Sequence, residues 1–217
     1  HGLTGVRAGR NPEVKATYFY TPIGIGSTWD PELYGKVGSA LAKELRATEQ
    51  HLNLGPTLNI IRHPLGGRNW ESLAEDPYLT GKMVVPFIKA QQKNGVIAGP
   101  KHFVANNQEK NRFDINNEID QRTLREIYLP GFKAAFVEGG ALNAMCAYTR
   151  LNGEYACENK WLLTDLLRDE WGFKGFVVSD FSRAVHSTVP SIKSGMNIEM
   201  HRTVYYGDKL LAAVNDG

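Results

Sequence analysis

The sequence predicts an α/β fold, a (β/α)8 TIM-like barrel that is incomplete in this chain or part of a larger multidomain protein. Strand-like apolar runs alternate with helix-like stretches along the chain, which is typical of parallel βαβ units. Ionisable side chains follow the ends of several of these runs, at the edge where the loops of a barrel converge. Only six strand-like runs occur in 217 residues, whereas a closed barrel has eight strands.

The strand-like runs are apolar and are bounded by glycine, proline or polar residues. They cover residues 19–26, 51–60, 95–103, 141–148, 175–180 and 195–200. A further strand is expected before His1, and the chain stops in a helix-like stretch over 205–217. We therefore expect residues 1–217 to form one barrel domain, truncated at both ends, whose open edges are covered by sequence or a chain outside it.

Helix-like stretches separate these runs and cover residues 31–48, 81–94, 121–139 and 159–172. Asp30 is a candidate N-cap for the first, with Pro31 at the first helical position. Asp76 precedes a proline and is expected to cap the second or turn the chain into it. Pro86 lies inside the second stretch and must kink or shorten that helix. Gly172 is a candidate stop signal for the last helix.

Composition and charge exclude several classes of partner. Hydrophobic residues make up 42% and charged residues 22% of the chain, which is the ordinary globular balance. The net charge is +2 without a basic block, so we expect no nucleic-acid partner. No apolar run approaches the roughly 20 residues of a membrane span, so we expect a soluble protein with no membrane partner. Its compartment stays open between cytoplasmic and secreted or periplasmic.

The sequence gives no sign of a metal, a cofactor or a fixed redox state. The histidines lack the spacings typical of metal sites, and no glycine-rich phosphate loop occurs, so we expect neither a metal nor a cofactor. Cys146 and Cys157 either pair in an oxidising milieu or stay reduced in a core.

Polar residues collect where the strand-like runs end. Lys101 and His102 end the third run, Tyr148 ends the fourth, and Asp180 ends the fifth. The second run continues into Arg62 and the stretch GGRN. A doubly wound open sheet would bind a ligand at the same edge, but it usually carries a phosphate-binding glycine loop. The barrel interpretation is therefore favoured, with its active-site face at this edge.

Each of these residues also has a structural interpretation. Asp180 is either a solvated strand terminus or a carboxylate held at the rim of a sheet. Lys101 and His102 are neighbours, and adjacent side chains on a plain strand point to opposite faces. A bulge, a bend or a cis peptide would be needed to aim both at one ligand; otherwise they mark a frayed strand end. Arg68 either binds a ligand or pairs with a nearby glutamate, and Tyr148 is otherwise a rim aromatic.

Five stretches of the sequence together resemble glycoside hydrolase family 3, most closely its β-glucosidase branch. They are RHPLGGRNWESLAEDPYLTG (62–81), KHFVANNQE (101–109), IDQRTLREIYLPGF (119–132), MCAYTRLNGEYACEN (145–159) and GFKGFVVSD (172–180). The resemblance implies hydrolysis of terminal non-reducing β-linked sugars, most simply β-D-glucosides, with retention of configuration. The substrate would be a small carbohydrate or glycoside. The acid/base glutamate would come from a further domain or chain.

The resemblance also implies roles for particular residues. Asp180 corresponds to the catalytic nucleophile, Lys101 and His102 to a sugar-binding pair, and Arg68 to an arginine that holds a sugar hydroxyl. Tyr148 corresponds to the tyrosine that orients the nucleophile. Phe181 stands where the family has a tryptophan wall for the sugar. Glu109 and Arg112 are interpreted as structural ion partners.

The chain departs from the family pattern at positions that matter for function. His1 stands where the family has a sugar-gripping aspartate, Thr149 replaces an asparagine, and MNIEMH (196–201) replaces LDLEMP. A histidine cannot accept two hydroxyl hydrogen bonds as a carboxylate does. A non-hydrolytic sugar-binding or regulatory pseudoenzyme of the same fold therefore stays open as the alternative to an enzyme.

Overall fold

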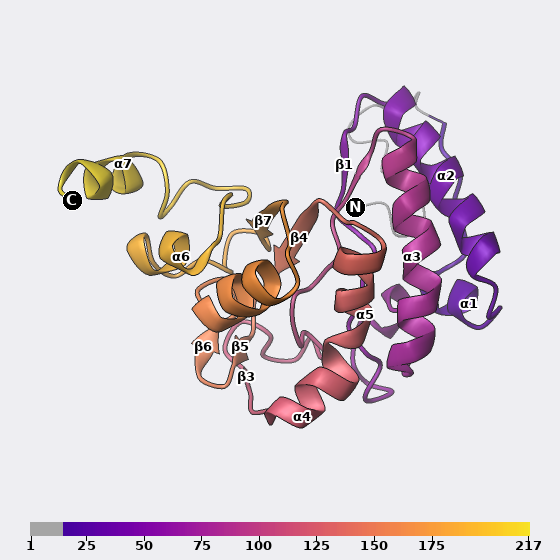
Figure 1. Ribbon diagram of the computed structural model, residues 1–217, viewed down its shortest axis with the longest axis horizontal. Helices are drawn as coiled ribbons and strands as arrows, with labels where there is room; N and C mark the ends of the chain where they lie inside the picture. The colour runs from indigo at the N-terminus through magenta and orange to yellow at the C-terminus, as the bar shows by residue number, and fades with distance from the viewer. Residues whose placement is uncertain (1–14) are drawn as a thin grey trace.

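The computed structural model describes residues 15–217. His1 and the strand expected before it lie outside the described residues. The described part is an α/β fold in which short parallel strands lie at the centre and helices pack outside them (Figure 1). Its strands do not close into a barrel within this part of the chain, which confirms the prediction of an incomplete barrel.

The central strands follow one another in sequence order, as the strands of a barrel do. The regular pieces are β1 (Leu52–Asn53), β2 (Ile97–Ala98), β4 (Asn143–Cys146) and β7 (Phe176–Ser179). β1 pairs with β2 and β4 with β7, both in parallel. Parallel bridges join Thr57 to Lys101, Phe103 to Cys146 and Val178 to Ile198. Five predicted runs, from 51–60 to 195–200, are therefore consecutive neighbours whose carboxyl ends share one edge.

The prediction of a strand over 19–26 is wrong, because this stretch contains helix α1 (Pro22–Gly26). Pro22 occupies the first turn, where its fixed φ favours a helix. The buried positions are Pro22, Ile25 and Gly26, which follows the spacing of a helix rather than the alternation of a strand. Apolar content alone could not separate the two.

The first two long helices are capped as predicted. α2 (Pro31–Ala47) begins where the Asp30 side chain accepts a hydrogen bond from the Leu33 N–H at 2.9 Å. α3 (Pro77–Lys93) begins earlier than the predicted 81–94, because Asp76 accepts from the Leu79 N–H and caps the helix there. The two helices lie side by side (Figure 1), and Tyr34 of α2 stacks on Phe87 of α3 at 4.2 Å.

The later helices are less regular than predicted. The stretch 121–139 divides into α4 (Gln121–Thr123), α5 (Pro130–Lys133) and two π-helical segments, η2 (Leu124–Tyr128) and η3 (Ala134–Glu138). The proline at the start of α5 has no backbone N–H to donate, so the helical hydrogen-bond pattern is interrupted between η2 and α5. The stretch 159–172 forms the π-helical segment η4 (Trp161–Glu170). No described helix is long and apolar enough to span a bilayer.

Several short elements were not predicted. A small sheet consists of β3 (Asn116–Asn117), β5 (Arg150–Leu151) and β6 (Glu154–Tyr155), and η1 (Asn69–Glu71) is a single 3-10 turn. β5 and β6 form a hairpin whose turn residues, Asn152 and Gly153, have φ of 51° and 98°. An Asn-Gly pair is the usual signal for such a turn. α6 (Val189–Ser194) and α7 (Asp208–Asn215) end the chain, and α7 lies away from the sheet (Figure 1).

We expect Gly175→Ala to destabilise the sheet that carries the end of β7. A Cβ at Gly175 would lie 2.1 Å from the Leu142 carbonyl oxygen. The two residues directly precede the paired strands β7 and β4, and the Phe176 N–H holds the same carbonyl at 3.1 Å. Overpacking of this kind costs about 1–3 kcal/mol, and each kcal/mol lowers the Tm of a domain of this size by about 2–4 °C. Thermal unfolding measures the change. Gly24→Ala is the matched control, because its Cβ would make only ordinary contacts in α1; an equal effect of both substitutions would contradict the prediction.

Candidate active site

A cavity of about 230 Å³ lies where the central strands end. It is lined by Leu54, Arg68, Lys101, His102, Arg112, Met145, Tyr148, Asp180 and Phe181. All six predicted site residues are among them, so the structure brings together side chains that are up to 113 positions apart in the chain (Arg68 to Phe181). The cavity is smaller than the roughly 300–1,000 Å³ typical of sites for drug-sized ligands. Its size suits a small ligand such as one sugar ring.

Asp180 is a buried carboxylate and not a solvated strand terminus. Its side chain follows β7 directly and the residue is 7% exposed. Its backbone N–H donates to the Cys146 carbonyl at 3.1 Å, and Oδ1 accepts from the Phe181 N–H at 2.7 Å. Oδ2 accepts no hydrogen bond from a described residue and lies 3.6 Å from His102 Nε2. One carboxylate oxygen is therefore fixed and the other faces the cavity lining.

The pKa of Asp180 reflects opposing effects. Burial raises the pKa of the carboxyl above its ordinary value, because removal from water disfavours the charged form. The Phe181 N–H and the positive charge of Lys101 act in the opposite direction. Positive charge near Asp180 therefore favours the ionised form, which is the form able to act as a nucleophile.

Lys101 and His102 both line the cavity although they are neighbours in the chain. The peptide bond between them is cis. A cis peptide is one of the three backbone features that would let both side chains face the same ligand. Lys101 is 5% and His102 is 2% exposed, so neither belongs to a frayed strand end.

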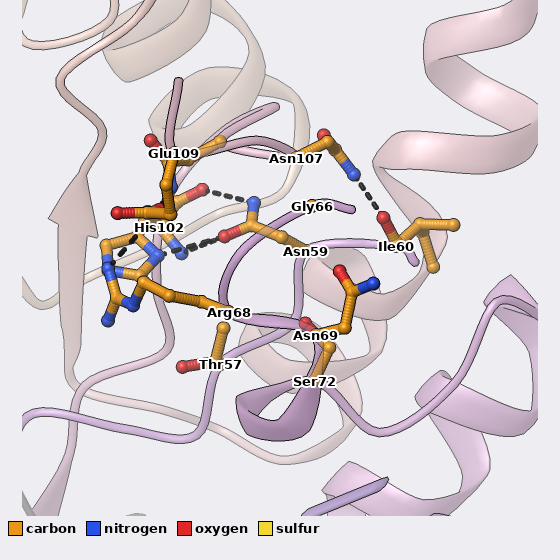
Figure 2. Close-up of a pocket in the computed structure, with 11 residues that line it drawn as sticks. Thr57, Asn59, Ile60, Gly66, Arg68, Asn69, Ser72, His102, Asn107 and Glu109 are labelled. Carbon is orange, nitrogen blue, oxygen red and sulfur yellow. Dashed lines mark hydrogen bonds and ion pairs between the residues drawn. The ribbon is translucent and has the colours of Figure 1, made fainter. Parts of the chain in front are cut away.

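Asn59 fixes the imidazole of His102 (Figure 2). Its side-chain oxygen lies 3.0 Å from the His102 backbone nitrogen and 2.9 Å from Nδ1, and its amide nitrogen donates to the His102 carbonyl at 2.9 Å. An amide oxygen only accepts hydrogen bonds, so Nδ1 carries the proton and Nε2 is an acceptor. Arg68 Nη1 lies 3.3 Å from Nε2. Burial, followed by the charge of Lys101, holds the pKa of His102 well below its ordinary value, so the ring is neutral near pH 7.

Arg68 both pairs with a glutamate and lines the cavity. Its guanidinium makes two hydrogen bonds to Glu71, at 2.9 and 2.7 Å, and lies 3.7 Å from Glu109. Figure 2 shows Arg68 beside His102 at a second cavity of about 10 Å³ that shares both residues. That volume is about enough for one water molecule, so the larger cavity is the candidate ligand site.

Tyr148 and Arg112 also belong to the lining and contact each other. The Tyr148 hydroxyl donates to the Phe181 carbonyl at 2.8 Å, next to Asp180, and burial followed by the Asp180 charge raises the pKa of Tyr148. Arg112 lies over the Tyr148 ring at 4.8 Å and pairs with Glu109. The sequence predicts only a structural role for Arg112, as an ion partner. The structure adds that Arg112 lines the cavity, for which its stretch of sequence carries no signal.

The two cysteines form a disulfide, Cys146–Cys157, which decides between the two states left open by the sequence. Cys146 is the last residue of β4 and pairs in register with Ser179. Its carbonyl accepts the Asp180 N–H, so the cross-link is attached directly to the strand end beside the carboxylate.

The lining can bind a neutral molecule rich in hydroxyl groups and can place one carboxylate against it. Lys101, Arg68 and Arg112 offer charged donors, which form stronger hydrogen bonds than neutral ones. Asp180 is the only carboxylate among the described residues that line the cavity. Within residues 15–217 there is also no group of three or more His, Cys, Asp or Glu placed to hold a metal ion.

Comparisons with known proteins agree with this architecture. The model of the glycosyl hydrolase family 3 N-terminal domain matches residues 4–217. A beta-glucosidase of Rhizobium radiobacter is 44% identical, over 100% of this chain and 27% of its own length. An exo-alpha-(1->6)-L-arabinopyranosidase of Bifidobacterium breve is 45% identical, over 94% of this chain and 27% of its own length.

A solved structure shows the same likeness in three dimensions. The crystal structure of a GH3 beta-glucosidase of Bifidobacterium adolescentis superposes with a TM-score of 0.94 at 44% identity. It matches 100% of this chain, and this chain covers 31% of it. The chain thus spans less than a third of the length of each of these relatives.

Proposed function

The chain belongs to glycosyl hydrolase family 3, and on that premise we propose that it carries the sugar-binding pocket and the nucleophile of a retaining β-glycosidase. Residues 1–217 would be the N-terminal barrel domain of that enzyme. The substrate would be a terminal, non-reducing β-linked sugar, most simply a β-D-glucoside. The position of Asp180, a buried carboxylate with one unbonded oxygen among three cations, is the observation that carries the proposal.

Asp180 would act in two displacement steps. In the first, Oδ2 attacks the anomeric carbon and the bond to the leaving oxygen breaks, while an external acid protonates that oxygen. In the second, water attacks the same carbon, its proton goes to the base form of that acid, and the bond to Oδ2 breaks. The Phe181 N–H on Oδ1 keeps the carboxylate in one orientation during both steps.

The rest of the lining would hold the sugar ring. Lys101, Arg68 and Arg112 would donate hydrogen bonds to hydroxyl oxygens. Nε2 of the neutral His102 would accept one from a hydroxyl group, because its proton is on Nδ1. Phe181, a half-buried aromatic residue of the lining, would cover one face of the ring.

The acid/base group would come from outside the described residues. A retaining glycosidase needs a second carboxyl about 5–5.5 Å from the first, whereas the nearby Glu71 and Glu109 are paired with arginines. We propose that a further domain or chain supplies this carboxyl and covers the open edge beyond Ile198, whose side chain is 43% exposed.

The test is covalent labelling together with a substrate panel, applied to the full natural chain that contains these residues. An activated 2-fluoro-β-D-glucoside should label Asp180, as found by mass spectrometry of peptides. Nitrophenyl β-D-glucoside should be hydrolysed faster than the α-L-arabinopyranoside, which lacks the hydroxymethyl group and has the C4 hydroxyl inverted. The reverse order would change the proposed sugar. Label on another carboxylate would sink the assignment of the nucleophile. Binding of glucose without any turnover would support the pseudoenzyme alternative.

A further inference from the structure

The segment after the last bridged position of the sheet is held in place by one carboxylate. Glu199 follows Ile198, which bridges to β7. The Glu199 carboxylate accepts hydrogen bonds from three successive backbone N–H groups, those of Val204, Tyr205 and Tyr206, at 2.9–3.1 Å. Residues 200–203 are therefore closed into a loop whose two ends are fixed.

The same loop is fastened to the backbone beside Asp180. The Met200 N–H donates to Ser179 Oγ at 2.8 Å, and the Ser182 N–H donates to the Met200 carbonyl at 2.8 Å. Met200 also packs with Phe181 against the apolar cluster that contains Leu54 and Met145, two residues of the cavity lining. The loop thus packs against residues of the cavity lining, and it carries His201, the residue after Met200.

His201 is exposed and lies beside Phe181, a residue of the cavity lining. Its ring lies 5.3 Å from the ring of Phe181, at an interplanar angle of 39°. Nδ1 lies 2.8 Å from Ser182 Oγ, which fixes the edge of the imidazole that faces the chain. No described residue hydrogen-bonds Nε2, and His201 is exposed.

The cavity has one buried end and one open end. Lys101, His102 and Met145 are at most 5% exposed and form the buried end, whereas Arg68, Arg112 and Phe181 are only half-buried and form the open end. A sugar ring seated among the buried donors has its leaving group directed toward solvent, because the external acid must reach the leaving oxygen. Within the described residues, Phe181 is the aromatic part of the open end, and the exposed ring of His201 lies next to it.

We propose that His201 is a specificity-determining residue that selects a second sugar ring as the leaving group, and this inference rests on the proposed function. The leaving ring lies against the Phe181–His201 wall, and Nε2 makes a hydrogen bond with one of its hydroxyl groups. A simple aryl leaving group offers no hydroxyl to His201 and does not benefit.

The test is calorimetry on the full natural chain with two ligands: glucose, and a β-linked glucose disaccharide whose bridging oxygen is replaced by sulfur. His201→Phe keeps a ring but removes the hydrogen bond, and it should weaken disaccharide binding by about threefold to tenfold, the worth of one neutral hydrogen bond. Glucose binding should not change. His201→Gln should restore most of the loss. The control is His51→Ala, which lies at the start of the first central strand and far from this edge. It should change the binding of neither glucose nor the disaccharide.

The outcomes separate this inference from the proposed function. Unchanged disaccharide binding in His201→Phe, or an equal loss of glucose binding, overturns the role of His201. Failure of the unaltered protein to bind either ligand overturns both proposals. If the disaccharide binds and responds to His201 but no glycoside is hydrolysed, the leaving-ring subsite stands and the hydrolytic function falls.

Discussion

Asp180→Asn in the full natural chain will lower kcat by about four orders of magnitude or more, which is the scale of loss when a covalent nucleophile is removed. Asparagine keeps the size of the side chain and its acceptor oxygen for the Phe181 N–H, but it cannot form the glycosyl-enzyme bond. No other described carboxylate lines the cavity to replace it. Steady-state hydrolysis of nitrophenyl β-D-glucoside measures the loss.

The same variant should be more stable than the unaltered protein at neutral pH. The folded-state pKa of Asp180 is raised by burial, so the folded state holds this proton more tightly than the unfolded state. The stabilising effect of the raised pKa is complete at low pH and is lost as pH rises through it. Asparagine does not titrate. The asparagine variant should therefore have the larger free energy of unfolding above the raised pKa of Asp180, and the difference between the two proteins should disappear below the ordinary pKa of aspartate.

Thermal unfolding at neutral and acidic pH measures this difference. An asparagine variant that keeps glucose binding, has a raised Tm at neutral pH and has lost turnover would separate loss of the nucleophile from loss of the fold. Turnover within tenfold of the unaltered protein would contradict the role of Asp180.

Lys101→Met will lower kcat/KM by about 10²–10³, the typical effect of removing one charged donor from an active site. Methionine has a similar length but offers no hydrogen bond to a sugar hydroxyl. The Lys101 charge also lowers the pKa of Asp180, so its removal raises that pKa. The acid limb of the kcat/KM profile should therefore move to higher pH, because Asp180 must be ionised to act.

A pH profile of kcat/KM for the two proteins tests this. Lys43→Met, an exposed position on α2, is the matched control and should leave both quantities unchanged. A fall in kcat/KM with an unmoved acid limb would contradict the electrostatic part of the prediction. A lower Tm with unchanged kinetics would make Lys101 a structural residue only.

Much of the fold was predictable because its signals are local. Asp30 and Asp76 cap α2 and α3 through hydrogen bonds to residues three positions ahead, so the sequence contains both partners close together. The missed hairpin between β5 and β6 also had a local signal, the Asn152–Gly153 pair. The strand predicted over 19–26 is wrong because a short apolar run fits a strand and a buried helical turn equally well.

The alternation of strands and helices, the resemblance to the family and the polar residues that end the strands can all be read from the chain without a structure. Which of these residues meet, and in what state, follows only from the three-dimensional fold. Asn59 holds the neutral tautomer of His102 from 43 residues away, Arg112 joins the lining, and Cys146 and Cys157 are bonded. The reason is physical. Caps and turns depend on contacts within a few residues. The features listed here depend instead on the register of the parallel strands, and that register is set by packing between side chains that are distant in sequence.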